Sequence, residues 1–138
     1  MKKLFAFFLM AGFLSTLCLS GQTSNWVKTT DGQVNCKKVS VQGETVKVVL
    51  ENGEKQTLPV SSVVSFFADD KLYIKMPVQT RGEKKEALME FVKTRDDMSL
   101  YKLLDKGNYR YLVYKGNEMY VELLDGNRAE FEKFFYLQ

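Results

Sequence analysis

The stretch from residue 108 to 124 most constrains what this chain can fold into, because two runs rich in β-branched and aromatic residues flank the pair Gly116-Asn117. Such a pair readily takes the positive φ angles of a two-residue hairpin turn. The turn places Lys115 opposite Glu118, and strict alternation then divides the other side chains between two faces. The face predicted to be buried carries Arg110, Leu112, Tyr114, Met119, Val121 and Leu123. The other face, which can meet water or a partner, carries Tyr111, Val113, Tyr120 and Glu122.

The tyrosines supply a candidate binding surface. All seven lie after residue 70, and a ring with a polar tip suits recognition surfaces as well as strand packing. Packing between strands alone would also account for them, since aromatic residues are favoured in β-sheets. The binding alternative uses Tyr111, Val113 and Tyr120 of the face that can meet a partner, with Arg110 or Lys115 nearby as the cation.

The N-terminus has the order of residues typical of a secretory signal peptide. Lys2 and Lys3 precede an apolar run from Leu4 to Leu19, and small polar residues follow. The run is shorter than the roughly 20 apolar residues of a membrane span, so we predict cleavage near residue 21 rather than a retained anchor. Cys18 leaves a lipoprotein alternative, although Leu17 stands where that processing prefers a small side chain. The mature chain is therefore predicted to be periplasmic or exposed at the cell surface.

Composition excludes several chemistries. The full chain has 20 basic and 17 acidic residues, and without Lys2 and Lys3 the counts are 18 and 17, a net charge of +1. A chain so close to neutral is not predicted to bind nucleic acid. Histidine is absent, which excludes histidine-based nucleophile activation, histidine general bases and the usual histidine-containing zinc sites. We therefore predict no cofactor and no metal site.

Cys36 is the single cysteine left after the predicted cleavage. One cysteine cannot form a disulfide within the chain and cannot supply Cys-x-x-Cys redox chemistry. Two alternatives remain for it: a buried side chain that behaves as a small apolar residue, or a free thiol able to pair with another chain.

The polar motifs that remain do not predict a catalytic site. Ser99-Leu-Tyr-Lys102 matches the Ser-x-x-Lys motif of penicillin-binding enzymes. That chemistry needs both side chains on one helical turn, whereas on a strand they point to opposite faces. Asp69-Asp70 and Asp96-Asp97 are adjacent pairs in predicted turns, where neighbouring carboxylates diverge. We therefore predict that the protein is not an enzyme, with a histidine-independent hydrolase as the remaining alternative.

Residues 22–80 are predicted to form an antiparallel meander of short strands. A bulge is expected at Lys37-Lys38, and a four-residue loop is predicted at Glu51–Glu54. The succession of turns and strands consists of Asp31-Gly32, Gly43, Val46–Leu50, Asn52-Gly53, Leu58–Val60 and Val63–Phe66. This succession resembles the SH3-like or Sm-like small β-barrel. The resemblance implies short, strongly bent strands over residues 27–76, in an architecture that often binds peptides, peptidoglycan or nucleic acid.

Residues 81–138 are predicted to form a second lobe, which the polar connection Arg81–Glu86 separates from the first. Ala87–Lys93 has the propensity of a helix, but it is short and lies between turn signals. We therefore predict a strand there, paired with Met98–Leu103.

A helix is predicted at the C-terminus. Asn127 can cap it, and Glu130 can complete a capping box. Its apolar stripe is Phe131, Phe134 and Phe135, and so short a helix must dock to persist. We predict that it docks on the face of the hairpin predicted to be buried, which carries Leu112. The Ser-Leu-Tyr strand at 99–101, the tyrosine-rich hairpin and the aromatic helix together resemble small exported bacterial envelope proteins of unknown function. That resemblance implies no particular activity.

The sequence as a whole predicts a mainly β (α+β) protein. Its parts are a signal peptide over residues 1–21, an SH3-like or meander lobe over 22–80, and an antiparallel hairpin lobe with a C-terminal helix over 81–138. The predicted function is non-catalytic binding of a protein or glycan partner in the bacterial cell envelope. The alternative is a structural or assembly role, in which an exposed edge strand pairs with a partner's sheet.

Overall fold

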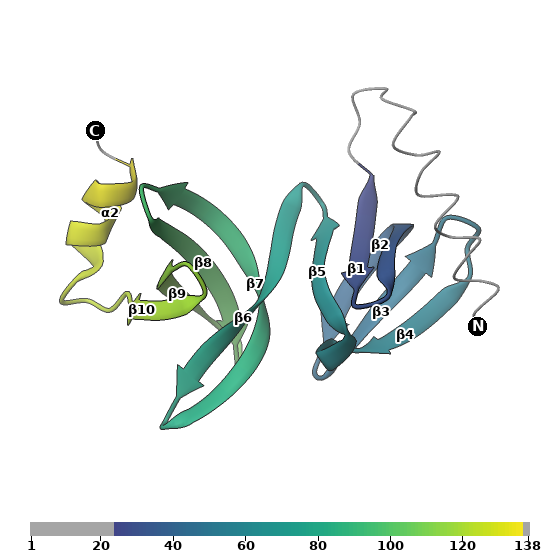
Figure 1. The fold of residues 1–138 in the computed structure, drawn as a ribbon, viewed down its shortest axis with the longest axis horizontal. Coiled ribbons are helices and arrows are strands. Elements are labelled where there is room, and N and C mark those ends of the chain that lie inside the picture. Colours follow the sequence, from purple (N-terminus) through teal and green to yellow (C-terminus); the bar gives the residue numbers. More distant parts are fainter. Residues whose placement is uncertain (1–23, 137–138) are drawn as a thin grey trace. The chain divides into compact units, whose positions relative to one another are not determined.

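The structure, a computed structural model, describes residues 24–136. The predicted signal peptide at residues 1–21 lies outside the described residues. The described chain is mainly antiparallel β-sheet with one C-terminal α-helix, α2 (Arg128–Tyr136), which confirms the predicted fold class (Figure 1). Its contacts divide into two compact units between Tyr73 and Ile74. This division falls earlier in the chain than residues 81–86, where the composition of the sequence predicts a boundary.

Unit 1 contains the strand order β5-β1-β2-β3-β4. Its elements are β1 (Asn25–Thr29), β2 (Gly32–Gln42), β3 (Thr45–Leu50), β4 (Lys55–Pro59), a 3-10 turn η1 (Val60–Ser62) and β5 (Val63–Ala68). Alternate residues of β3 point inward, and Val46, Val48 and Leu50 are at most 2 % exposed. The period-two pattern of the sequence thus becomes one wall of the buried core.

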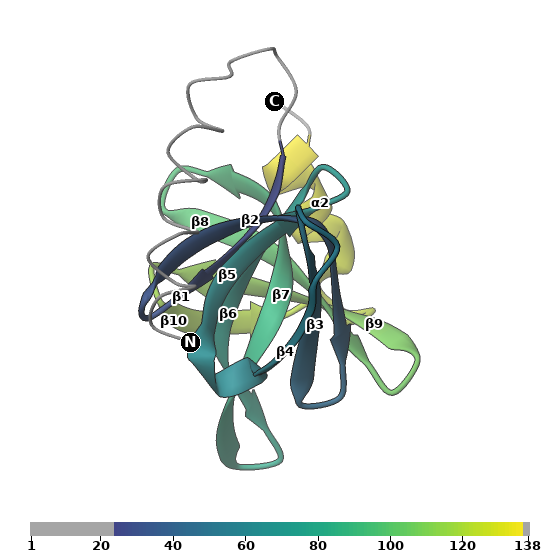
Figure 2. The same cartoon turned by 90° about the vertical axis from the view of Figure 1, so that its right-hand side faces the viewer.

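Strand β2 contains the predicted bulge. Its register against β3 shifts between Cys36 and Lys38, which leaves Lys37 as the extra residue. A bulge bends a strand and increases its twist, and β2 curves accordingly in Figure 2.

The connection between β3 and β4 has the predicted bounds, residues 51–54, but its register differs from the prediction. Val49 pairs with Lys55, and the Leu50 N–H donates to the Glu54 carbonyl at 2.8 Å. This hydrogen bond encloses a turn over residues 51 to 53 within that connection. Gly53 has φ 90°, the left-handed value that closes a three-residue hairpin. The predicted register is wrong by one residue here, because this glycine extends the turn rather than the strand.

Unit 2 is a meander in which β6, β7, β8, β9 and β10 lie side by side in chain order. The bounds are β6 (Lys71–Thr80), β7 (Glu83–Arg95), β8 (Met98–Asp105), β9 (Asn108–Lys115) and β10 (Glu118–Glu122), and the first residues of β6 belong to unit 1. The strand predicted over residues 87–93 is confirmed, as is its pairing with β8.

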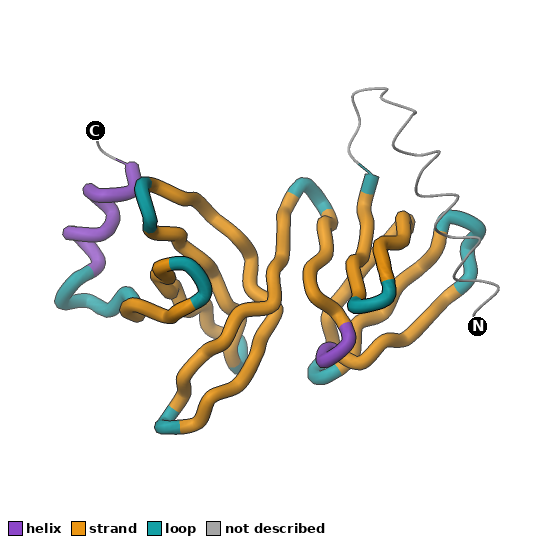
Figure 3. Tube along the Cα trace, viewed as in Figure 1, coloured by secondary structure: helices purple, strands orange, loops and turns teal. Residues whose placement is uncertain are grey.

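Two-residue turns join each strand from β5 to β10 to the next, and they are the short loop segments of Figure 3. Asp69 and Asp70 both have positive φ, 54° and 65°, and Asp96 has φ 54°. Positive φ values suit the tight turns whose twist matches that of the flanking strands. Both predicted aspartate turns are therefore confirmed, as is the two-residue turn at Gly116-Asn117.

The pairing of β9 with β10 corrects the predicted register. The first two pairs follow the prediction, but Val113 then pairs with Val121 rather than with Tyr120. Tyr120 is the extra residue of a bulge, and a shift of one residue moves all later side chains to the opposite face. Val121 and Leu123, predicted to share a face with Leu112, therefore lie on the other side.

Both faces of the unit 2 sheet are buried. One face, termed the tyrosine face, holds the buried residues Met76, Val78, Met89, Tyr101, Leu112 and Tyr114. The opposite face, termed the helix face, holds Leu100, Val113 and Leu123 against Phe135 of α2. Three consecutive residues of β9, from 112 to 114, are 0 % exposed. The prediction that one face of this hairpin meets water or a partner is therefore wrong for the centre of β9.

Helix α2 covers the helix face, whereas the sequence predicts docking on the face that carries Leu112. Phe135 is 2 % exposed, and Phe131 and Phe134 pack beside it. Arg95 of β7 reinforces this contact, since its guanidinium donates to the Phe134 carbonyl and lies 5.2 Å from the centre of the Phe134 ring. The bulge explains the change of side, because it moves apolar residues of β10 under the helix.

The helix begins after Asn127 as predicted, but the cap has a different form. The side-chain oxygen of Asn127 accepts a hydrogen bond from the Leu124 N–H at 2.8 Å, and its amide donates to the Glu122 carbonyl at 3.1 Å. The backbone carbonyl of Asn127 accepts from the Phe131 N–H at 3.3 Å. Asn127 thus ties the start of the helix to the end of β10.

Tyr114 lies at the centre of the tyrosine face. Its ring meets that of Tyr101 edge to face, with 5.2 Å between centroids, and its hydroxyl donates to the Pro77 carbonyl at 2.6 Å. Burial, with a smaller effect from Tyr101, raises the pKa of Tyr114 to about 12. The hydroxyl therefore keeps its proton at neutral pH, and this hydrogen bond satisfies a polar group that would otherwise be costly to bury.

Replacement of Phe135 by alanine should destabilise unit 2 by about 3 kcal/mol, because a buried ring is lost and a cavity remains. Urea unfolding followed by circular dichroism measures the change. Tyr136→Ala is a matched control on the same helix, since this side chain is 52 % exposed. Its loss should change stability by no more than about 0.5 kcal/mol. Equal effects of the two substitutions would contradict docking through Phe135.

Candidate functional site

The predicted binding residues Lys115 and Tyr120 come together at the turn between β9 and β10. The Lys115 Nζ atom lies 4.2 Å from the centre of the Tyr120 ring. Phe131 of α2 meets the same ring edge to face, with centroids 6.5 Å apart. These three residues are termed the hairpin tip. Tyr120 remains 53 % exposed, because it is the bulge residue and a bulge aims its side chain out of the regular pleat.

Arg110, also predicted to bind a partner, belongs to an internal clamp. Its Nε and Nη2 atoms donate to the two carboxylate oxygens of Glu122 at 3.0 and 2.8 Å. Its Nη1 atom donates to Asp105 and Thr80, each at 3.3 Å. The hydrogen bond with Glu122 raises the pKa of Arg110. The Arg110 side chain is 17 % exposed, and its guanidinium is bonded to side chains of other strands rather than offered to a ligand.

Val113 and Tyr111 do not join the hairpin tip. Val113 is 0 % exposed beneath α2, so it cannot contact a partner in this fold. Tyr111 lies on the same face and is half-buried, with the Arg128 guanidinium 5.5 Å from the centre of its ring. The prediction groups these residues because it assumes an unbroken alternation and a helix on the other side of the sheet.

Cations lie over aromatic rings across the helix face of unit 2. The pairs are Lys93 with Tyr136, Arg95 with Phe134, Lys102 with Tyr109, Lys115 with Tyr120, and Arg128 with Tyr111, at 4.1 to 5.5 Å. The sequence identifies the tyrosines as candidates and, apart from Lys115 beside Tyr120, does not identify their cationic partners. Each partner comes from a neighbouring strand or from α2, so it can be found only once the register and the helix position are known.

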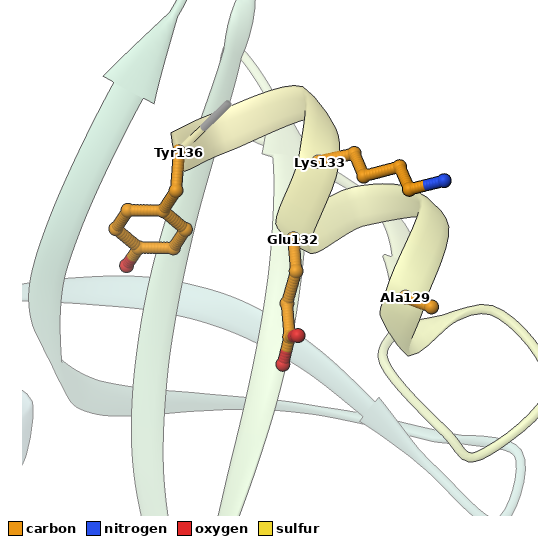
Figure 4. A pocket seen from close by; sticks show the side chains of 4 residues that line it. All are labelled: Ala129, Glu132, Lys133 and Tyr136. Carbon is orange, nitrogen blue, oxygen red and sulfur yellow. The ribbon is translucent and has the colours of Figure 1, made fainter. Parts of the chain in front are cut away.

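Helix α2 also carries a shallow hollow (Figure 4). Ala129, Glu132, Lys133 and Tyr136 line it, and its volume is about 440 Å³. These residues follow the spacing of one helical stripe. Glu132 and Tyr136 extend to one side of the helix and Lys133 to another. The charged groups therefore do not converge on a single point.

Cys36 is buried, at 3 % exposure, which confirms the interior alternative. Burial, with a smaller effect from the Glu51 charge, raises the pKa of the Cys36 thiol to about 12. The thiolate is the nucleophilic form of cysteine. At neutral pH this side chain therefore behaves as a small apolar group and is not offered to another chain.

The other polar motifs stay dispersed. Ser99 lies on the tyrosine face, with its Oγ atom 3.0 Å from Thr94 Oγ1, whereas Lys102 lies on the helix face. The Ser-x-x-Lys match therefore places its two residues on opposite sides of β8, as predicted. Asp69-Asp70 and Asp96-Asp97 occupy separate turns. Among residues 24–136, no group of three or more cysteine, aspartate or glutamate side chains is placed to hold a metal ion.

The comparisons with known proteins identify no relative. No family model, no curated protein and no solved structure matches this chain. Within the part that the structure describes, no helix is long and apolar enough to cross a membrane. A function for the chain therefore has to be inferred from its own side chains.

Weakening of the Arg110 clamp should destabilise the protein in a graded way. Arg110→Lys should cost about 1 kcal/mol, because lysine keeps the charge but loses the bidentate geometry. Arg110→Met should cost about 2 kcal/mol, because it leaves the Glu122 carboxylate without its partner. Urea unfolding measures both variants against the natural protein. A methionine variant more stable than the lysine variant would contradict the clamp.

The Cys36 thiol should not react with a disulfide reagent at pH 8 in the folded protein. A pKa of about 12 leaves almost no thiolate at that pH, and burial excludes the reagent. The thiol should react fully once urea unfolds the chain, and absorbance of the released chromophore measures both rates. Comparable rates in the two states would show that the thiol is accessible in the folded protein, which would contradict the burial of Cys36.

Proposed function

We propose that the protein is an exported, non-catalytic binding or adaptor protein of the bacterial cell envelope, which recognises a protein or glycan partner through the hairpin tip. The observation that carries this proposal is the exposed Tyr120 ring, held between Lys115 and Phe131. A ring held in place offers a large contact area and loses little entropy on binding. The ammonium beside it can select an acidic or polar group on the partner.

An SH3-like barrel is the architecture we propose for unit 1. The order β5-β1-β2-β3-β4 returns the last strand to the first, and the 3-10 turn η1 precedes that strand. Val27 of β1 lies between Val34 of β2 and Phe66 of β5, so β1 is paired on both sides. Trp26 and Phe67 are half-buried and stack across these strands with centroids 6.3 Å apart. They give unit 1 an aromatic surface of its own.

Features of the two outer strands make edge-strand pairing with a partner a less favoured alternative than binding at the hairpin tip. The outer strand of unit 1, β4, has Lys55 at its start and Pro59 at its end, and both residues discourage pairing with another chain. The outer strand of unit 2, β10, has five residues and a bulge at Tyr120. The bulge interrupts the row of backbone groups that an added strand would need.

A hydrolase is the least favoured alternative. Carboxylate chemistry at a glycosidic bond needs two acids that face each other across a cleft. The aspartate pairs of the described chain occupy separate turns, and Ser99 and Lys102 lie on opposite faces of β8. Non-catalytic binding therefore accounts for the exposed groups with fewer assumptions.

Tyr120→Ala should reduce partner capture about tenfold, since central aromatic side chains dominate binding free energies. Photocrosslinking in intact cells from a probe at Asn117, followed by quantification of the trapped partner, measures the loss. Lys115→Gln should reduce capture by a smaller factor, because it removes one exposed charge.

Tyr136→Ala is the matched control for this experiment, because Tyr136 is equally exposed and also lies beneath a lysine. It should leave capture from the hairpin tip unchanged. All three variants should unfold within about 0.5 kcal/mol of the natural protein, since their side chains are exposed. Equal loss of capture with Tyr120→Ala and Tyr136→Ala would refute recognition through the hairpin tip.

A further inference from the structure

A second surface of unit 2 lies on the helix face, beyond the area that α2 covers. The register of β8 against β9 places Lys102 opposite Tyr111 and Leu104 opposite Tyr109, all on this face. Arg128, at the start of α2, borders the surface through its contact with Tyr111. These five residues are termed the open strip.

The open strip is accessible, and its outer end is apolar. Leu104 is 60 % exposed and Tyr109 is 58 % exposed, and the two side chains are direct cross-strand neighbours. Tyr111 is half-buried next to the helix. Exposed apolar side chains that adjoin one another mark binding surfaces, whereas isolated ones need no explanation.

Each ring of the open strip has a cation above it. The Lys102 Nζ atom lies 4.1 Å from the centre of the Tyr109 ring, and the Arg128 guanidinium carbon lies 5.5 Å from the centre of the Tyr111 ring. Contacts of this kind are weak at exposed sites, so an anion can draw the cation aside and uncover the ring. A fitting ligand must therefore offer an anion to the cation and a flat apolar face to the ring at once.

We propose that the open strip binds an acidic glycan, a chain of sugar units that carry carboxylates. The C–H face of a sugar ring packs on the electron-rich face of a tyrosine, and its carboxylate pairs with the displaced cation. Tyr109 and Tyr111 lie on the same face of β9, so a rise of roughly 3.4 Å per residue spaces them about 7 Å apart. The combination of ring and cation thus occurs twice along the strand, which suits a repeating ligand. A neutral glycan would displace the cations from the tyrosine rings without offering them a negative charge in exchange.

Glu90 is an acidic residue beside this surface. Glu90 of β7 lies opposite Lys102, on the side away from Tyr111. Its carboxylate would repel an acidic ligand and compete with it for the ammonium. Asp105, which follows Leu104, instead turns to Arg110 of the internal clamp. The open strip can therefore bind an anion although the net charge of the whole chain is close to zero. Removal of the Glu90 charge should strengthen this binding.

Calorimetric titration of the purified full chain with oligogalacturonate, a carboxylated sugar chain, tests the proposal. A carboxylated hyaluronan fragment serves as a second probe. We expect Lys102→Gln and Arg128→Gln each to weaken binding about fivefold, and Tyr109→Ala about tenfold. Glu90→Gln should strengthen binding about threefold. Unfolding curves of the variants should match that of the natural protein, because Tyr109 and Arg128 are exposed and Lys102 and Glu90 are only half-buried.

Lys93→Gln is the matched control, because Lys93 makes the same lysine-over-tyrosine contact with Tyr136, at 4.7 Å, outside both the open strip and the hairpin tip. It should leave binding of the glycan unchanged. The methyl ester of oligogalacturonate keeps the sugar rings and loses the charge, so it should bind at least about tenfold more weakly than the acid.

Three results would overturn the proposal. The first is failure of both acidic glycans to bind, which would leave partner capture at the hairpin tip untouched. The second is binding of the methyl ester, of a single-stranded oligonucleotide or of anionic lipid vesicles as tightly as the acid. The third is equal weakening by Lys102→Gln and Lys93→Gln.

Discussion

The bulge at Tyr120 is the feature on which the arrangement of unit 2 depends. One extra residue lets the segment from β10 onward serve two cores, since Met119 packs on the tyrosine face while Val121 and Leu123 pack on the helix face. An unbroken alternation would place all three on one side and leave Phe135 with fewer partners. The same bulge aims the Tyr120 ring outward. The burial of both faces and the exposure of one tyrosine thus have a single cause.

Polar groups in unit 2 divide into those that hold the fold together and those that remain at its surface. Arg110 and Tyr114 belong to the first kind, because each is mostly buried and bonded to groups on other strands. Among the described residues, no buried side-chain nitrogen or oxygen lacks a hydrogen-bond partner. The lysines that lie over exposed rings belong to the second kind. Weak contacts suit recognition, because a partner can replace them at little cost.

Local signals in the sequence predict most of the fold, and register is what they miss. Turn residues predict the hairpins, including the one at Gly116-Asn117, and the pattern around Lys37 predicts the bulge in β2. Nothing local distinguishes Tyr120 from a regular strand residue, because its bulge depends on what packs on both sides of the sheet. A shift of one residue reverses every later side chain. That error led to the prediction of the helix on the wrong face, so Val113 was assigned to the binding surface and, apart from Lys115, the cations above the tyrosines were not recognised.

The two units differ in the loop-closure entropy that they lose when their strands pair during folding. In unit 2, each of the strands β7, β8 and β9 pairs with the next strand along the chain across a two-residue turn, so only short loops close as the sheet grows. In unit 1, Trp26 of β1 pairs with Phe67 of β5, across three intervening strands. Unit 1 leaves the ribosome first. One side of its first strand, β1, therefore stays unpaired until β5, the last strand of the unit, has been synthesised.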